Sequence, residues 1–144
     1  MKLIIVNGPN LNLLGTREPD IYGGNTLIEI ENMIKNYVEE NAYVFDLDFF
    51  QSNSEGEIVE SLQDAGKNCD GVIINAGGLT HTSVIILVCL LAINIPKIEV
   101  HISNPFTREE FRHNSYISKG VNGLICGFGA NSYLLAIDAM HKIV

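Results

Sequence analysis

The sequence predicts an α/β fold in which helices cover both faces of a doubly wound, five-stranded parallel sheet. Short, continuously apolar runs such as Leu3–Val6 and Gly71–Asn75 are typical of strands that are buried on both faces. Segments with helical periodicity lie between these runs, and strands that alternate with helices favour parallel pairing through right-handed crossovers. With 144 residues the chain has the usual length of one domain, so we expect a single domain over residues 1–144.

The first strand, Leu3–Val6, ends at an Asn-Gly-Pro turn and is followed by a long glycine-containing segment. A helix is predicted next, with Asn25 or Thr26 as its N-terminal cap and with its end near Asn41. The run Tyr43–Phe50 alternates and is rich in Val and Phe, which predicts the second strand. The buried face of the helix is expected at Leu27, Ile30, Ile34, Tyr37 and Val38.

In the middle of the chain, Ser54 and Glu57 match a capping box, and the helix that they begin is expected to end at Gly66. The buried strand Gly71–Asn75 follows, and then a nearly all-apolar helix, Thr82–Ile93. A helix that is apolar on all sides is usually buried, either within its own chain or against another subunit. The capped helix is expected to bury Ile58, Val59, Leu62 and Ala65.

The last third of the chain contains two more predicted strands, Lys97–Ile102 and Gly123–Cys126, and a closing helix, Asn131–Ile143. These complete the set of five strands, and no internal repeat or low-complexity tract interrupts them. The inward positions of the closing helix are expected to be Leu134, Leu135, Ile137, Ala139 and Met140.

Composition limits the classes of partner. The chain has 17 acidic and 9 basic residues, which disfavours binding to nucleic-acid backbones. The longest apolar run, Val84–Ile93, is about half of the roughly 20 residues that a membrane-spanning helix needs, and the start Met1–Asn10 is typical of a strand, not of a signal sequence. Cys69, Cys89 and Cys126 lack metal or disulfide spacing and are expected to be structural thiols. We therefore expect a cytoplasmic protein with no nucleic-acid and no membrane partner.

The connection after the first strand, Asn7–Gly24, is much longer than the roughly 2 to 6 residues that are usual in α/β domains. Its apolar content is too high for a solvated linker. We expect residues 8–24 to form an ordered lid or wall of a binding site. The apolar side chains of this segment are Leu11, Leu13, Leu14, Ile21 and Tyr22.

Polar side chains follow the predicted strands at one edge of the sheet. Doubly wound sheets bind their ligands beyond the carboxyl ends of the strands, and the chain places asparagine, arginine, histidine and tyrosine residues there. This convergence predicts a binding site at that edge, and its cluster of arginines and histidines could receive an anionic small substrate. The residues are Asn10, Arg17, Tyr22, Asn75, His81, His101, Arg108 and Arg112.

His101 lies two residues after Glu99 in a predicted strand, so both side chains point to the same face. The carboxylate can hold one ring nitrogen and orient the imidazole for proton transfer; the alternative is a strand-end histidine that is bonded to backbone. The stretch Ile102–Pro105 resembles a helix start, and its free backbone N–H groups could receive a carboxylate.

Tyr22 lies five residues after Arg17. A tyrosine is neutral at pH 7, and stabilising its phenolate there takes roughly 4 kcal/mol, for which one adjacent cation is usually not enough. A tyrosine base therefore needs a second cation, and Arg108 is a candidate. Ordinary interpretations remain for each residue: a packing tyrosine, a plain loop histidine at His81, and surface ion pairs at Arg108 and Arg112, which are four residues apart and could share a helical face.

Four motifs together resemble the type II 3-dehydroquinate dehydratase (type II dehydroquinase) family: NGPNLNLLGTREPDIYG, IINAGGLTHTS, EVHISN and REEFRHNSYIS. They stand in the family's order and spacing and span essentially the whole chain. The resemblance implies a flavodoxin-like domain, no cofactor and no metal, and a homo-oligomer of trimers that assemble into a dodecamer. It also implies the removal of water from 3-dehydroquinate to give 3-dehydroshikimate through an enolate, a step of the shikimate pathway to the aromatic amino acids.

The resemblance implies a role for each site residue. Tyr22 is the base that takes the proton alpha to the ketone, with Arg17 and Arg108 stabilising its phenolate. His101, oriented by Glu99, is the acid that protonates the departing hydroxyl. The other implied roles are holding the water that stabilises the enolate (Asn10), binding the substrate and its carboxylate (Asn75, Ile102 and Ser103) and contacting the ring hydroxyls (His81 and Arg112).

The sequence departs from the family's pattern at two places. Ala76–Leu79 stands where the family usually has proline followed by Gly-Ala-Tyr, and Leu87 and Val88 stand where Arg and Asp are common. In the family that aspartate reaches the neighbouring subunit's active site. With Val88 at this position, the neighbouring site lacks the expected polar partner. Two alternatives therefore stay open: a diverged lyase for a related cyclic hydroxy-ketone acid, and a flavodoxin-like module that binds an anionic metabolite without turnover.

Overall fold

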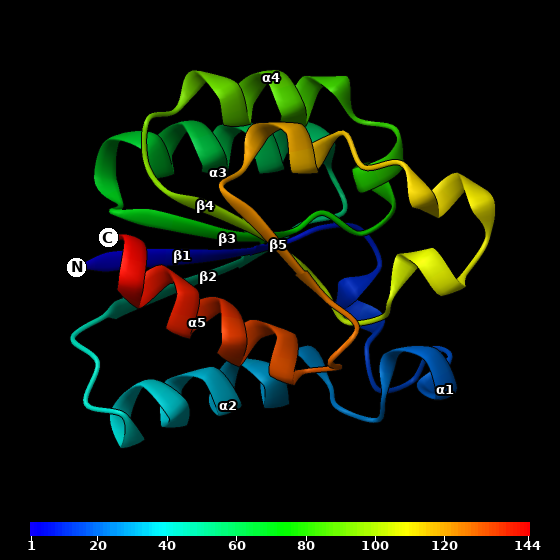
Figure 1. Ribbon diagram of the computed structural model, residues 1–144, viewed down its shortest axis with the longest axis horizontal. Coiled ribbons are helices and arrows are strands. Elements are labelled where there is room, and N and C mark those ends of the chain that lie inside the picture. Colours follow the sequence, from blue (N-terminus) through cyan, green and yellow to red (C-terminus); the bar gives the residue numbers. More distant parts are fainter.

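A five-stranded, all-parallel sheet lies at the centre of the structure, a computed structural model that describes Met1–Val144. The strand order is β2-β1-β3-β4-β5, and helices cover both faces of the sheet (Figure 1). The doubly wound, flavodoxin-like single domain predicted from the sequence is confirmed. The strands are β1 (Lys2–Asn7), β2 (Asp46–Gln51), β3 (Gly71–Asn75), β4 (Lys97–His101) and β5 (Gly123–Cys126).

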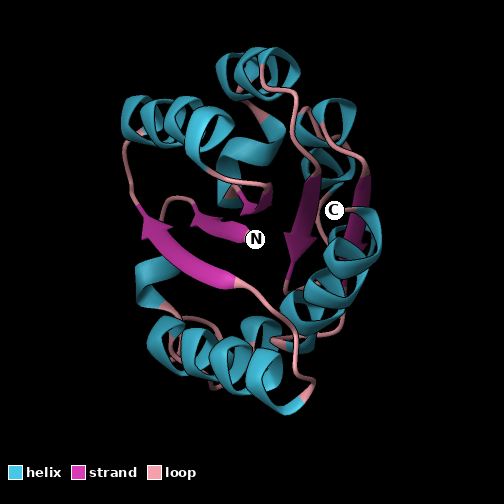
Figure 2. Ribbon diagram, turned by 90° about the vertical axis from the view of Figure 1, so that its left-hand side faces the viewer, coloured by secondary structure: helices cyan, strands magenta, loops and turns pink.

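Two helices cover each face of the sheet. The helices α2 (Leu27–Glu40) and α5 (Asn131–Ile143) lie on one face, and α3 (Glu55–Asn68) and α4 (Val84–Ala92) lie on the other (Figure 1). Figure 2 shows the strands between these two helical layers. Neighbouring residues of a strand point to opposite faces, so each layer encloses its own apolar core.

The strand β1 contributes to both cores. Leu3 and Ile5 pack with side chains of α2 and α5, whereas Ile4 and Val6 pack with side chains of α3 and α4. None of the four is more than 8% exposed. Full burial of one such side chain stabilises the fold by about 1.5–3 kcal/mol. A continuous apolar run is therefore what a strand with two covered faces requires.

Polar side chains set where the helices begin. At α2, Thr26 Oγ1 accepts a hydrogen bond from Glu29 N at 3.2 Å, and Glu29 Oε2 accepts one from Thr26 N at 2.8 Å. At α3 the predicted capping box is only half formed. Ser54 Oγ accepts a hydrogen bond from Glu57 N at 3.4 Å, but the Glu57 carboxylate accepts from the Ser52 hydroxyl instead of from the Ser54 backbone.

The predicted start of the second strand is wrong, because β2 begins at Asp46 and not at Tyr43. The Tyr43 side chain packs against α5 instead of joining the sheet. Its ring stacks on His141 with 4.2 Å between the ring centroids, and its hydroxyl donates to Asp138 Oδ1 at 2.9 Å. These contacts keep the chain packed on α5, so it joins the sheet only at Asp46.

The helix α3 is longer than predicted, and α4 leaves one of its sides open in this chain. α3 continues past Gly66 to Asn68, since one glycine costs a helix only about 1 kcal/mol. α4 is not buried on all sides within the chain: one side packs on α3, and the other is open. No helix combines the length and the apolarity needed to cross a bilayer. The open side of α4 consists of Val84, Ile85, Val88 and Leu91, which are 51–61% exposed.

The segment 8–24 contains short helical turns and is not irregular throughout. It forms a 3-10 helix, η1 (Leu11–Leu13), and a single helical turn, α1 (Pro19–Tyr22). Leu11 and Leu14 are buried in the core that α2 and α5 cover. Apolar side chains therefore anchor the segment over the ends of the strands.

Replacing Gly8 by alanine is predicted to destabilise the fold. Gly8 N–H donates to Asn75 O at 2.8 Å, and a Cβ at this position would lie 2.4 Å from Ala76 O. Because backbone atoms cannot move away as a flexible side chain can, we expect a loss of about 1–3 kcal/mol in the free energy of unfolding, measured by urea denaturation. Gly56→Ala in α3 is the control, since its Cβ would meet only Ser54 Oγ at 3.8 Å. Equal midpoints for both variants would contradict the prediction.

Candidate active site

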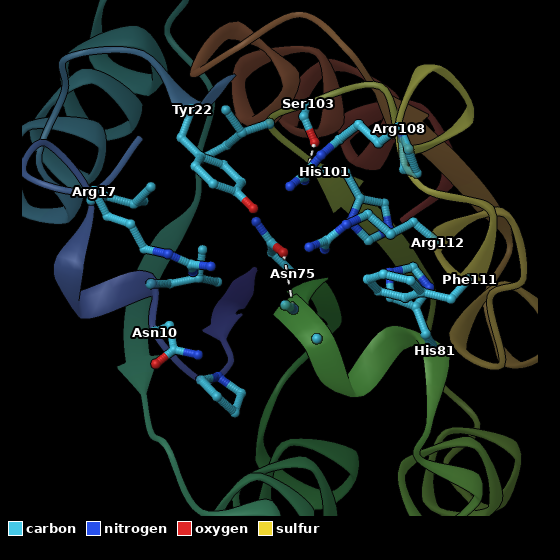
Figure 3. A pocket seen from close by; sticks show the side chains of 17 residues that line it. Asn10, Arg17, Tyr22, Asn75, His81, His101, Ser103, Arg108, Phe111 and Arg112 are labelled. Carbon is cyan, nitrogen blue, oxygen red and sulfur yellow. Dashed lines mark hydrogen bonds between the residues drawn. The ribbon is translucent and has the colours of Figure 1, made fainter. Parts of the chain in front are cut away.

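A cavity of about 170 Å³ lies at the carboxyl edge of the sheet, and its walls come from the segments that follow β1, β3 and β4 (Figure 3). This is the edge that the sequence predicted. Ten of the eleven predicted site residues line the cavity, and the eleventh, Glu99, bonds to one of the ten. The ten are Asn10, Arg17, Tyr22, Asn75, His81, His101, Ile102, Ser103, Arg108 and Arg112.

The cavity attracts anions although the whole chain has a net charge of −8. Its lining contains three arginines and two histidines but no aspartate or glutamate. The local charge is therefore positive, which favours a negatively charged small molecule. No group of three His, Cys, Asp or Glu side chains is close enough together to hold a metal ion.

Tyr22, the last residue of α1, lies between two guanidinium groups. The Cζ atoms of Arg17 and Arg108 are 5.5 and 5.0 Å from the centroid of its ring. Arg108 is held in place by the hydrogen bond that its Nη1 donates to Ser103 Oγ at 3.1 Å. Figure 3 shows the tyrosine hydroxyl directed into the cavity. The ring of Tyr22 thus makes cation–π contacts with both arginines.

His101, the last residue of β4, is bonded to Glu99 through its Nε2, 2.7 Å from Glu99 Oε1. The Glu99 carboxylate is fully buried and also accepts hydrogen bonds from Ser115 Oγ at 2.7 Å and from the Ser118 hydroxyl. Burial by itself raises the pKa of Glu99, but the hydrogen bonds from His101 and the serines outweigh it, so the pKa lies below its ordinary value. Glu99 is therefore an anion that orients the ring and leaves Nδ1 for a bound molecule.

Ile102 and Ser103 supply free backbone donors at the end of β4. Their N–H groups make no hydrogen bond within the chain, and both residues line the cavity. The predicted helix start, with a cap and a proline, is present at Asn104 and Pro105. Only a 3-10 turn, η3 (Pro105–Thr107), follows, and its cap Asn104 accepts from Phe106 N at 3.1 Å. The free N–H groups thus come from the end of the strand.

His81 and Arg112 stand together at the side of the cavity. His81 Nδ1 donates to Asn114 O at 2.8 Å, and partial burial lowers the pKa of the ring. Arg112 Nε donates to Glu109 Oε2 at 2.7 Å. Arg108 and Arg112 do not share a helical face, which their spacing allowed, because Arg112 belongs to a separate 3-10 turn, η4 (Glu110–His113). Both arginines nevertheless reach the same cavity.

Asn10 and Asn75 complete the polar lining. Asn10 has a left-handed backbone with φ of 68°, and its N–H donates to Asn53 Oδ1 at 2.9 Å, which fixes the turn after β1. Asn75 is the last residue of β3, and Figure 3 shows its amide directed toward the centre of the cavity.

Several residues of the site were given no role by the sequence analysis. Phe111 lines the cavity, with its ring edge-on to that of His81 at 6.0 Å between the centroids. Ser115 and Ser118 act through Glu99, and the buried Tyr133 hydroxyl accepts a hydrogen bond from Asn75 at 3.0 Å. Phe111, Ser115 and Ser118 lie within the motif REEFRHNSYIS, but an apolar ring and isolated hydroxyls do not by themselves indicate a role. The two serines and Tyr133 reach the site only through the folding of the chain.

The chain matches the family model described as Dehydroquinase class II over residues 1–141. A 3-dehydroquinate dehydratase of Prochlorococcus marinus (strain NATL1A) is 50% identical over 140 residues, which are 97% of this chain and 95% of that protein. One of Sinorhizobium medicae is 49% identical over 141 residues, 98% of this chain and 94% of that protein. The crystal structure of the type II dehydroquinase from Butyrivibrio crossotus DSM 2876 has a TM-score of 0.93 at 44% identity and covers 97% of each chain. The resemblance found in the motifs is thus confirmed, and the chain belongs to the dehydroquinase class II family of hydro-lyases.

Proposed function

We propose that this protein removes water from 3-dehydroquinate to give 3-dehydroshikimate in the shikimate pathway to the aromatic amino acids. One observation carries the proposal: the tyrosine between two guanidinium groups and the histidine on a buried carboxylate line the same anion-attracting cavity. A base and an acid on one cavity suit an elimination, in which a C–H proton leaves one carbon and a hydroxyl leaves the next. The names of the relatives supply the substrate.

In the first step, the Tyr22 phenolate takes the proton from the carbon next to the ketone. The electron pair of that C–H bond passes to the ketone oxygen and forms an enolate. Arg17 and Arg108 stabilise the phenolate before the transfer, and their positions on the ring, 5.5 and 5.0 Å from its centroid, support this role. Asn10 holds a water molecule that donates a hydrogen bond to the enolate oxygen.

In the second step, the enolate re-forms the ketone and expels the hydroxyl from the neighbouring carbon. His101 gives that hydroxyl a proton, so it leaves as water, and a conjugated product remains. Glu99 stabilises the imidazolium before the transfer and fixes the orientation of the ring through Nε2. Tyr22 has then gained one proton and His101 has lost one, and exchange with solvent restores both. No redox step and no covalent intermediate is needed.

The remaining lining residues bind the substrate. The free N–H groups of Ile102 and Ser103 bind its carboxylate together with the Asn75 amide, because unpaired backbone donors suit a negative charge. His81 and Arg112 contact the ring hydroxyls. The segment 8–24 acts as a lid that carries Arg17 and Tyr22 and closes on Arg108.

We further propose that the protein is a cytoplasmic homo-oligomer, with trimers that assemble into a dodecamer. The open side of α4 supports association, since four large apolar side chains there are more than half exposed and contiguous apolar patches commonly mark protein interfaces. Val88 lies within this patch, so an apolar contact stands where the family commonly has an aspartate.

Replacing Tyr22 by phenylalanine is predicted to remove turnover while the fold and substrate binding persist. The ring and its packing remain, but no hydroxyl is left to take the proton, and one acid–base group is worth about 10²–10⁴ in rate. The measurement is the ultraviolet absorbance of the conjugated product after addition of 3-dehydroquinate. Tyr116→Phe is the matched control, since Tyr116 contacts Lys119 and lies outside the cavity. Near-normal turnover of Tyr22→Phe would refute the assignment of Tyr22 as the base. Binding of 3-dehydroquinate without turnover by the wild type would refute 3-dehydroquinate as the substrate.

Replacing His101 by alanine is predicted to block the loss of water more than the removal of the alpha proton. The base Tyr22 remains intact, so enolate formation continues, but the hydroxyl has no proton donor. In D₂O the recovered 3-dehydroquinate should carry deuterium at the alpha carbon while the product signal falls by about 10²–10⁴-fold. If deuterium exchange is lost to the same extent as dehydration, the assignment of His101 as the acid of the second step is wrong.

Replacing Ile85 by aspartate is predicted to reduce the size of the assembly. Ile85 is 60% exposed on α4, and an unpaired carboxylate in an apolar interface costs several kcal/mol. Light scattering after size-exclusion chromatography measures the mass. Val44→Asp is the control, because Val44 is an exposed apolar residue before β2, remote from α4 in the chain, and should leave the mass unchanged. A monomeric wild type, or an Ile85→Asp protein of wild-type mass, would count against the proposed interface.

A further inference from the structure

A buried chain of three polar side chains lies directly behind the cavity. Asn75 Nδ2 donates to the Tyr133 hydroxyl at 3.0 Å, and that hydroxyl donates to Asn7 Oδ1 at 2.6 Å. The residues come from the ends of β3 and β1 and from α5, and none is more than 3% exposed. Only Asn75 lines the cavity. Tyr133 and Asn7 can therefore influence a bound molecule only through Asn75.

The hydrogen bonds determine how the Asn75 amide is oriented. Asn7 Oδ1 can only accept, so it takes the single Tyr133 hydroxyl proton, and the Tyr133 oxygen must accept from Asn75 Nδ2. On the other side of the amide, Gly77 N–H donates to Asn75 Oδ1 at 3.2 Å. A flipped amide would place its nitrogen against Gly77 N–H and its oxygen against the Tyr133 oxygen. The flip would break the bond from Gly77 N–H, and the flipped oxygen could bond to the Tyr133 hydroxyl only by taking the proton that Asn7 Oδ1 accepts. One orientation is therefore favoured.

The packing of Tyr133 does not require its hydroxyl. The fully buried ring belongs to the apolar core that α2 and α5 cover, and a phenylalanine would make the same apolar contacts. Burying a hydroxyl and two amides carries a desolvation cost that their hydrogen bonds only offset. The polar chain therefore serves the orientation of its members better than it serves stability.

We propose that Tyr133 and Asn7 are positioning residues that hold the Asn75 amide so that its second N–H faces the substrate carboxylate. An amide nitrogen has two hydrogens, and Tyr133 occupies one of them. The other joins the free N–H groups of Ile102 and Ser103 as a third donor at the end of the strands. This inference rests on the proposed function, in which that carboxylate binds here.

The test is Tyr133→Phe, which removes one oxygen atom and leaves the ring. The Asn75 amide then keeps only Gly77 N–H to distinguish its two ends, so it presents its oxygen to the substrate carboxylate part of the time. We expect the KM for 3-dehydroquinate to rise about tenfold, as for the loss of one hydrogen bond to a charged group, and kcat to change by less than about threefold, because the bond serves binding and not proton transfer.

The matched control is Tyr37→Phe. The Tyr37 hydroxyl also donates to a residue of α5, Asp138 at 2.9 Å, and Tyr37 does not line the cavity. This variant deletes the same atom from the same helical layer, so its KM should equal that of the wild type even if its melting temperature falls. A second variant, Asn7→Ala, removes the acceptor at the far end of the chain and should raise KM in the same way. The double variant should then be no worse than Tyr133→Phe, since both changes act through one amide.

The possible results test the positioning role and the proposed function separately. A folded Tyr133→Phe protein with unchanged KM, or a Tyr37→Phe protein with an equally raised KM, overturns the positioning role. If the wild type does not dehydrate 3-dehydroquinate, the proposed function fails, and the orientation is read by NMR from the Asn75 side-chain amide. One of its protons should exchange slowly in the wild type and rapidly in Tyr133→Phe, and rapid exchange in both proteins also overturns the inference.

Discussion

The arrangement of the site depends on the buried carboxylate of Glu99. An isolated ionised carboxylate inside a protein is unfavourable by several kcal/mol, and this one is fully buried. Three donors compensate it: His101 Nε2, Ser115 Oγ and Ser118 Oγ. The chain that leaves β4 must therefore return to it within the segment 105–118, and this requirement shapes the wall of the cavity.

The same segment, 105–118, contacts the surroundings of both proposed proton-transfer residues, Tyr22 and His101. On its way out, the segment carries Arg108 onto the ring of Tyr22, and it then brings Arg112 to the side of His81 before Ser115 reaches the carboxylate. One stretch of chain thus orients the histidine and places a second cation beside the tyrosine. A disturbance of the buried charge would reach both residues, even though they lie on segments that are far apart in the sequence.

Much of the fold and of the site could be predicted because the signals are local. Apolar runs and helical periodicity predicted all five strands and the four main helices, and the carboxyl-edge rule predicted where polar side chains would meet. The pair of Glu99 and His101 follows from a separation of two residues in a strand. Errors fell where a side chain found a partner other than the expected one, as at Tyr43, which packs on the distant α5, and at Glu57, which bonds to the nearby Ser52.

By itself, the sequence determined the sheet, the edge that carries the site and the residue types at that edge, since these follow from periodicity and from strand ends. Only the tertiary structure decided which groups touch. Arg108 is remote in sequence from Tyr22, and Tyr133 bonds to two strand ends through a helix that closes the fold. The apolar side of α4 is likewise exposed or covered according to its neighbours. Such contacts depend on how complete layers pack, and no local pattern of residues contains that information.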